Sequence, residues 1–250
     1  MSDRIKVTGM ILKTMPIGEY DKRVTLLTTD NGKIGAFVRG ARRPGSRLMA
    51  ASEPFVFGDF ELIEGRNSYT VGNVEVRDYF NELRGNVEAV LYGSYFLEFA
   101  DYYGRENNQD KDMLALLYLT IRALIRAKVD YRLIRCIYEF RVMAVNGDWP
   151  QVFQCVSCHK REHLKYFNGH KGGLYCEDCR GDAGMGAVKM DEAAVYALQY
   201  ILSSPPEKLY SFMVTDVILD QLRAAAELFR KRTVDRPMKS LELLDAMTAM

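Results

Sequence analysis

Four cysteines in two close pairs are the residues of this chain best suited to chemistry. Cys155 and Cys158 form one Cys-x2-Cys pair, and Cys176 and Cys179 form a second pair after 17 intervening residues. Each pair can place two thiolates against one metal ion, and two pairs complete the tetrahedron that zinc prefers. The spacing therefore predicts one structural zinc ion. Because all four ligands come from the protein, such a site has no open position at which to activate water.

Other uses of these cysteines give different expectations. With His159 the first pair matches the haem-attachment sequence Cys-x-x-Cys-His, and either pair alone resembles a redox dithiol. A haem site needs no second pair, and a redox pair is expected in a βαβ context, whereas the residues before Cys155 end a helix. His163 or His170 can replace a cysteine as ligand. Cys136 lies in an apolar helical stretch and is predicted to be a small core residue.

Arginines are concentrated in a second short segment, residues 39–47, which also contains two glycines and a proline. Glycine and proline disfavour regular structure, and a guanidinium group can hold two phosphate oxygens at once. The segment therefore predicts a flexible phosphate-binding loop, with a solvated charge run as the alternative. Its arginines are Arg39, Arg42, Arg43 and Arg47.

Neighbouring residues can extend this positive surface. Lys22, Arg23 and Lys33 are close to the loop in sequence. Small barrels bind single strands with a cationic groove and stacking aromatic rings, for which the candidates are Tyr20, Phe37 and Tyr69. A place in the hydrophobic core is the alternative for each ring.

The charge of the whole chain conceals this local excess. There are 34 basic and 33 acidic residues, a net charge of +1, which argues against a uniformly basic nucleic-acid-binding protein. Residues 1–50, however, contain ten lysines and arginines against four acidic residues, and residues 51–112 contain five against 13. Segregation of this kind points to a polyanionic partner for the N-terminal part alone.

The N-terminal part is predicted to be a small β-barrel. Apolar and β-branched runs predict strands at residues 5–15, 24–29, 33–39, 55–63 and 68–76. The Asp30-Asn31-Gly32 step predicts a hairpin between the second and third strands. Five short strands suit an OB-fold, with an SH3-like barrel as the competing architecture.

After residue 81 the apolar period changes to that of helices. Helices are predicted at residues 87–103, 113–128, 131–145, 191–202, 215–232 and 240–249, with Asn86 and Asp130 as N-caps of the first and third. We therefore expect an α+β chain of two domains. Residues 1–80 are expected to form the barrel, and residues 81–250 a helical domain with a four-cysteine insert at about 153–183.

The helical domain carries its own basic residues. Arg122 and Arg126 share a helix face, as do Arg132 and Arg135, because residues three or four apart are neighbours on a helix. An ordinary solvated face is one interpretation. The other is a docking site for an acidic peptide or for nucleic acid.

Several function classes lack their sequence signals. There is no G-x-G-x-x-G motif, no phosphate-binding loop of the G-x-x-x-x-G-K-[ST] type and no nucleophile motif, so we expect no enzyme. The N-terminus has no apolar signal segment, and no uninterrupted apolar run reaches 18 residues. A cytoplasmic protein without membrane association is therefore expected, with its cysteines reduced or bound to metal.

Several of these segments, taken in order, resemble one protein family. Residues 18–32, residues 39–47, the stretch 131–141 with the following Gly-Asp-Trp-Pro at 147–150, and the cysteine pairs resemble the bacterial DNA repair RecO family. The resemblance implies an N-terminal OB-fold and a helical C-terminal domain with a zinc-finger-like insert. It also implies a non-enzymatic recombination mediator that binds single- and double-stranded DNA and anneals complementary strands. The implied partners are RecR, the acidic C-terminal tail of single-stranded-DNA-binding protein and, indirectly, the RecA recombinase.

Carried over position by position, the resemblance assigns DNA contacts to Lys33, Arg39, Arg42, Arg43 and Arg47, and zinc binding to the four paired cysteines. No motif carries over the tail-binding site. Two alternative classes stay open from sequence. One is a protein–protein adaptor in which the barrel is only a scaffold, and the other is a zinc or redox enzyme.

Overall fold

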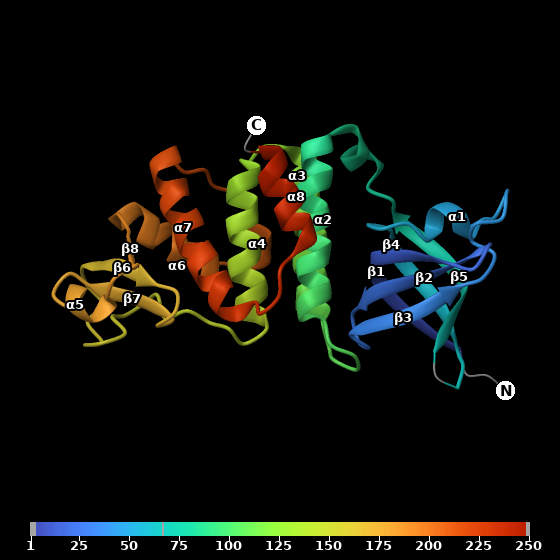
Figure 1. The fold of residues 1–250 in the computed structure, drawn as a ribbon, viewed down its shortest axis with the longest axis horizontal. Coiled ribbons are helices and arrows are strands. Elements are labelled where there is room, and N and C mark those ends of the chain that lie inside the picture. The colour runs from blue at the N-terminus through green and yellow to red at the C-terminus, as the bar shows by residue number, and fades with distance from the viewer. Residues whose placement is uncertain (1–3, 67, 249–250) are drawn as a thin grey trace. The chain divides into compact units, whose positions relative to one another are not determined.

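The computed structural model describes residues 4–66 and 68–248. The chain is mixed α+β, with strands at its N-terminal end followed by helices (Figure 1). It forms two compact units: Met1–Ile121 with Met238–Met250, and Arg122–Pro237.

Five strands open the first unit: β1 (Arg4–Ile17), β2 (Asp21–Thr28), β3 (Lys33–Val38), β4 (Phe57–Glu64) and β5 (Tyr69–Asp78). The pairing runs β1-β2-β3-β5-β4, and β4 also pairs with β1, so that each strand has two neighbours. The β3–β5 pairing is parallel and the others are antiparallel. The five predicted strands are confirmed with small shifts at their ends.

The predicted hairpin joins β2 to β3. Gly32 has a φ of +64°, a left-handed conformation that favours glycine. A Cβ atom at this position would also lie 2.0 Å from the carbonyl oxygen of Arg105. The turn therefore needs glycine both for its shape and for its contact with the loop that follows α2 (Val87–Tyr103).

Alternation along β2 and β3 separates the core from the outer surface. Val24 and Leu26 of β2, and Ile34, Ala36 and Val38 of β3, belong to the buried apolar cluster. The residues between them point outward, because successive side chains of a strand face opposite sides.

Lys22 lies on the same inward face of β2 as Val24 and Leu26, and its side chain is buried although it is charged. Its Nζ atom lies 2.6 Å from Oε1 of Glu53 and 3.1 Å from Oγ of Ser52, and the residue is only 8% exposed. The expectation that Lys22 extends the basic surface is therefore wrong. Its ammonium group is used inside the fold.

Replacing Lys22 by methionine is expected to lower the free energy of unfolding by about 1–3 kcal/mol, because buried acceptors lose their donor. Urea denaturation of Lys22→Met beside Arg23→Met measures this, since Arg23 is exposed and its change is expected to stay within about 0.5 kcal/mol. Equal stability of the two variants would contradict a structural role for Lys22.

Helices complete the first unit. Besides α2, they are α1 (Leu48–Ala51), η1 (Asn81–Gly85), α8 (Lys239–Thr248) and most of α3 (Lys111–Arg126). The predicted N-cap is confirmed, since Oδ1 of Asn86 accepts a 3.1 Å bond from the Ala89 amide. The C-terminal helix packs beside α2, where the Ser240 amide donates to Glu98 at 2.8 Å. Residue 249, the predicted end of that helix, lies outside the described residues.

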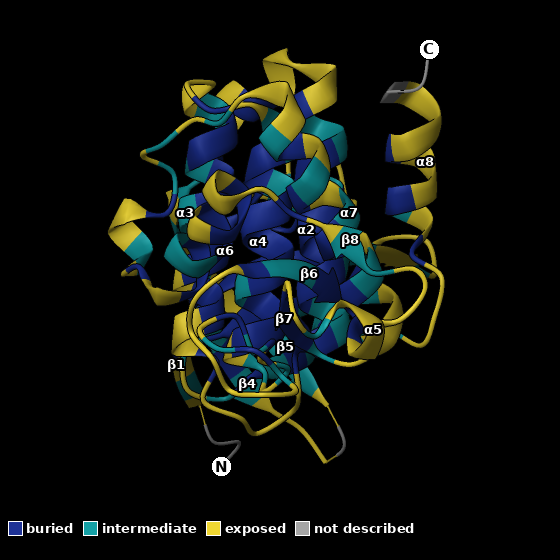
Figure 2. Ribbon diagram, turned by 90° about the vertical axis from the view of Figure 1, so that its left-hand side faces the viewer, coloured by how far each residue is buried: buried dark blue, intermediate teal, exposed yellow. Residues whose placement is uncertain are grey.

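The second unit is built on α4 (Tyr131–Val145), which is buried along most of its length (Figure 2). Around it lie α6 (Glu192–Ser203), η2 (Pro206–Lys208) and α7 (Asp216–Thr233). The cysteine insert contributes β6 (Leu164–Asn168), β7 (Gly173–Cys176), α5 (Arg180–Ala183) and β8 (Val188–Lys189), with sheet order β7-β6-β8.

Three aromatic rings join the insert to the helices. Phe167 of β6 lies 6.3 Å from Phe140 of α4 and 6.2 Å from Phe229 of α7, measured between ring centroids. All three side chains are fully buried.

Among the described residues, none of the helices combines the length and apolar character needed to cross a bilayer.

Candidate metal centre and nucleic-acid interface

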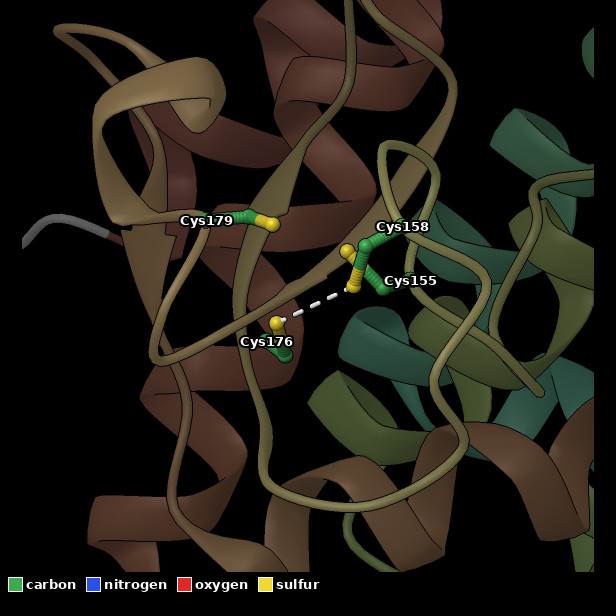
Figure 3. A group of neighbouring side chains, drawn as sticks. All are labelled: Cys155, Cys158, Cys176 and Cys179. Atoms are coloured by element: carbon green, nitrogen blue, oxygen red, sulfur yellow. Dashed lines mark hydrogen bonds between the residues drawn. The ribbon is translucent and has the colours of Figure 1, made fainter.

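The four paired cysteines converge from two turns that flank the β6–β7 hairpin. Cys155 and Cys158 precede β6, Cys176 ends β7 and Cys179 precedes α5 (Figure 3). Their four Sγ atoms lie within 4.8 Å of one another, and those of Cys158 and Cys176 are 3.6 Å apart. A tetrahedral zinc ion with bonds of about 2.3 Å separates its sulfur ligands by about 3.8 Å. The donor set therefore fits one tetrahedral metal ion.

The thiols of this cluster ionise unequally. Burial raises the pKa of Cys155, but backbone N–H groups of Cys158, Cys176 and Ser157 donate to its sulfur and lower the pKa to about 6. The pKa of Cys179 is raised to about 12, first because its sulfur interacts with the side chain of Cys158 and then by desolvation. Cys155 thus loses its proton at a lower pH than Cys179, and a divalent cation bound by the cluster favours the deprotonated form of its thiol ligands.

The structure reduces the number of side chains that could be ligands of this metal site. Among the described residues, the group of Cys, His and acidic side chains able to hold a metal consists of the four cysteines, without His163 or His170. Cys136 lies in α4, is 2% exposed and has its pKa raised by burial. The prediction that it is a core residue is confirmed.

The turn between β6 and β7 packs closely on α7. A Cβ atom on Gly169 would lie 2.5 Å from the carbonyl carbon of Leu228, and one on Gly172 would lie 2.2 Å from Nη1 of Arg232. Such distances exclude a side chain at Gly169 without displacement of backbone. A metal that fixes the hairpin therefore also fixes the surface that seats on α7.

The arginine segment is anchored, although its sequence predicts a flexible loop. The Arg42 amide donates to the Tyr20 carbonyl at 2.8 Å, and Nη1 of Arg42 donates to the Gly18 carbonyl at 3.2 Å. Ala41 is fully buried, and the Arg43 guanidinium lies 5.3 Å from the centroid of the Tyr20 ring. These contacts hold the segment against the β1–β2 turn, which sequence alone did not indicate.

The residues predicted to contact DNA differ in their exposure and in their existing partners. Four of the five are exposed on this anchored segment: Arg39, Arg42, Arg43 and Arg47. Lys33 instead donates to the Asp101 carbonyl at 2.6 Å and lies 3.3 Å from Oδ1 of the same residue. Its charge is thus already compensated, and it fastens β3 to α2.

A groove that the sequence did not reveal lies on the outer surface of β2 and β3. It has a volume of about 260 Å³ and is lined by residues that include Arg23, Gly35, Phe37 and Tyr69. Phe37 faces this groove, whereas Tyr69 also packs against the buried apolar cluster. The alternation of β3 is the sequence signal that points to Gly35 and Phe37.

The four arginines predicted for peptide docking are partly engaged with the chain itself. Arg132 lies 2.7 Å from Asp130 and 3.0 Å from Asp216, and Arg135 lies 2.9 Å from the buried carboxylate of Glu139. Arg126 is exposed and Arg122 is half-buried. A peptide carboxylate at Arg132 must compete with Asp216.

Comparison with known proteins identifies the family. The family model described as recombination protein O N terminal matches residues 1–80, and the one described as recombination protein O C terminal matches residues 84–242. The chain belongs to the RecO family.

Relatives in this family match between about two thirds and nearly all of their length. The DNA repair protein RecO of Acetivibrio thermocellus is 28% identical over 97% of both chains, and that of Thermoanaerobacter sp. is 28% identical over 98% of this chain and 99% of its own. The DNA repair protein RecO of Bacillus pumilus is 33% identical over 70% of this chain and 68% of its own. This chain thus matches both RecO family models, and it also contains the four-cysteine cluster.

Proposed function

We propose that this protein is a non-enzymatic, cytoplasmic recombination mediator that binds single- and double-stranded DNA during recombinational repair. In this proposal residues 1–80 form the DNA-binding domain. Residues 81–250 form the helical domain, with a structural zinc insert at about 153–183. The observation that carries the proposal is the anchored segment with its four exposed arginines in a chain of the RecO family.

The five-stranded domain is best described as an OB-fold barrel. Its strand order β1-β2-β3-β5-β4, with β4 returning to β1, supports a five-stranded barrel of this kind. OB-folds bind nucleic acid on the surface formed by their second and third strands together with adjoining loops. The arginine segment follows β3 directly, which supports a role for its charges together with that surface.

Strand annealing follows from charge neutralisation in this proposal. Guanidinium groups of the arginine segment contact phosphates of two strands and lower their mutual repulsion, so that complementary bases can pair. Annealing of this kind needs no covalent step. Zinc, when bound, would cross-link the insert through its four cysteines, which leave no coordination position open.

Partners are also part of the proposal. The protein associates with RecR and with the acidic tail of single-stranded-DNA-binding protein, and it helps load RecA. The tail docks on the arginines of α3 and α4, namely Arg122, Arg126, Arg132 and Arg135. A peptide carboxylate there takes the place of Asp216 beside Arg132.

Salt dependence tests DNA binding by the barrel. Fluorescence anisotropy with a labelled single strand is expected to give a slope of log K against log [salt] of about −3, at about −0.7 for each of four phosphate contacts. Affinity then falls about 50-fold between about 50 and 200 mM salt. A protein that binds RecR or the tail peptide but shows no salt-sensitive DNA binding would support the adaptor alternative instead.

A further inference from the structure

The arginine segment is fixed from one side by the turn between β1 and β2. Residues 18–20 connect the paired ends of these two strands. The carbonyl oxygens of Gly18 and Tyr20 both accept hydrogen bonds from Arg42, and the Tyr20 ring lies against the guanidinium of Arg43. This one turn therefore sets the place of the two central arginines of the segment.

Asp21, the first residue of β2, fixes the beginning of the segment. Its side chain accepts a hydrogen bond at Oδ1 from the backbone amide of Gly40, at 2.7 Å. Gly40 has a φ of +65°, and its carbonyl oxygen accepts a 3.1 Å bond from the Arg43 amide, so the chain turns back sharply at this point. Because the carboxylate of Asp21 bonds to a backbone amide, this contact occupies none of the four guanidinium groups.

The carboxylate of Asp21 has two opposite effects on the binding of a polyanion. By charge alone it repels phosphates, so its removal is expected to strengthen DNA binding. An unanchored segment, however, has to be ordered when DNA binds, and the apparent affinity falls with the fraction of molecules in which the segment is already in place. Because the two effects differ in sign, one substitution shows which of them is larger.

We propose that Asp21 is a positioning residue for DNA binding, which holds residues 39–43 in the conformation that presents their arginines to phosphates. The proposal rests on the DNA-binding function proposed above and adds a residue that does not itself contact DNA. Asp21 acts through the Gly40 amide, and it strengthens the binding of a polyanion although its own charge is negative.

Asp21→Ala and Asp21→Asn form a matched pair for fluorescence anisotropy with a labelled single strand. Both variants lose the negative charge, but only asparagine keeps an oxygen that can accept from the Gly40 amide. If the segment is in place in about a tenth to a third of Asp21→Ala molecules, single-strand affinity falls about three- to tenfold. Asp21→Asn is expected to bind at least as tightly as the unsubstituted protein. The salt slope is expected to stay unchanged in both variants, because all four arginines remain.

Gly40→Ala tests the other partner of this hydrogen bond without a change in charge. A Cβ atom at this position would lie 3.5 Å from Cδ of Arg43, so there is room for it, and the cost comes from the left-handed φ. Single-strand affinity is expected to fall about two- to fivefold. Thermal denaturation checks the fold of each variant, and Gly40→Ala decides the question if Asp21→Ala does not fold.

Limited digestion with trypsin reports on the anchoring of the segment without DNA. Cleavage after Arg39 and Arg42 is expected to be about three- to tenfold faster in Asp21→Ala than in Asp21→Asn or the unsubstituted protein, because proteases cut backbone that is exposed and unanchored. Mass spectrometry of the fragments identifies the cleaved bonds.

The outcomes separate this proposal from the proposed function. Equal affinities of Asp21→Ala and Asp21→Asn would overturn the positioning role while DNA binding stands. So would faster cleavage of Asp21→Ala together with unchanged or tighter binding of the single strand. If the unsubstituted protein binds no DNA, the proposed function is wrong and the positioning role falls with it, whatever trypsin shows.

Discussion

Reversing the charges of Arg42 and Arg43 together is expected to weaken single-strand binding by at least about 25-fold at about 0.1 M salt. Each phosphate contact on a single strand contributes a salt slope of about −0.7, which corresponds to about fivefold in affinity at this salt concentration. Two lost contacts give about 25-fold, and the new carboxylates add repulsion. Duplex binding is expected to fall as well, because both forms of DNA present phosphates. Anisotropy titrations over a salt series measure the affinities and a slope reduced by about 1.4.

The matched control for Arg42→Glu with Arg43→Glu is Lys128→Glu with Lys189→Glu. It changes the net charge equally at two exposed residues of the other compact unit. If the control weakens binding as much as the loop variant, affinity follows overall charge and not the arginine segment. Because Arg42 also donates to the Gly18 carbonyl, thermal denaturation must show that the loop variant keeps its N-terminal domain folded. An intact variant that binds and anneals strands like the unsubstituted protein would disprove the phosphate role.

Local sequence signals predicted the secondary structure well because they act within a few residues. Asn86 and Asp130 cap their helices through amides two or three residues away. Gly32 and the β-branched runs around it specify the β2–β3 hairpin. The cysteine cluster was predictable for a similar reason, since each Cys-x2-Cys pair is a local turn.

Long-range contacts were not predictable from one sequence, and they decide what each basic residue does. Lys22 pairs with Glu53, 31 residues away, and Lys33 bonds to Asp101, 68 residues away. In the sequence both lysines look like additions to the arginine segment. In the fold one is buried and the other joins a strand to a helix, because each lysine pairs with a carboxylate that offsets the cost of removing its charge from water.

The groove on the outer surface of β2 and β3 is a second feature that the sequence alone could not reveal. It depends on Gly35 lacking a side chain, on strand register and on a loop more than 70 residues further along, which brings in Asn107. Alternation shows that Phe37 faces outward but cannot show that the surface there is hollow. Arg132 and Arg135 are a further example. Helical spacing predicts that they share a face, but it does not predict their ion pairs with Asp216 and Glu139.

Replacing Cys155 and Cys158 by serine is expected to abolish zinc binding, from about one ion per chain to none. Structural zinc sites of this type have apparent binding free energies of about 10–16 kcal/mol, so two remaining thiolates cannot hold the ion under chelating conditions. The metal would be the cross-link between the two cysteine turns, so without it the turn that seats Gly169 on α7 is expected to open. Hydrogen exchange is expected to show loss of amide protection in β6, β7 and β8. Cys136→Ser, at a buried cysteine outside the cluster, is the control and keeps the ion.

Lower pH is expected to act in the same direction as the substitutions, because protons compete with the metal for thiolates. Zinc release followed with a chromogenic chelator should therefore increase as the pH falls. A DNA-binding measurement distinguishes a purely structural ion from one needed for function, since the N-terminal strands and the insert belong to different compact units. We expect the Cys155→Ser, Cys158→Ser variant to keep its single-strand affinity within about twofold, because none of the four arginines proposed to contact phosphates is altered. A large loss of affinity together with the zinc would mean that the insert takes part in binding DNA.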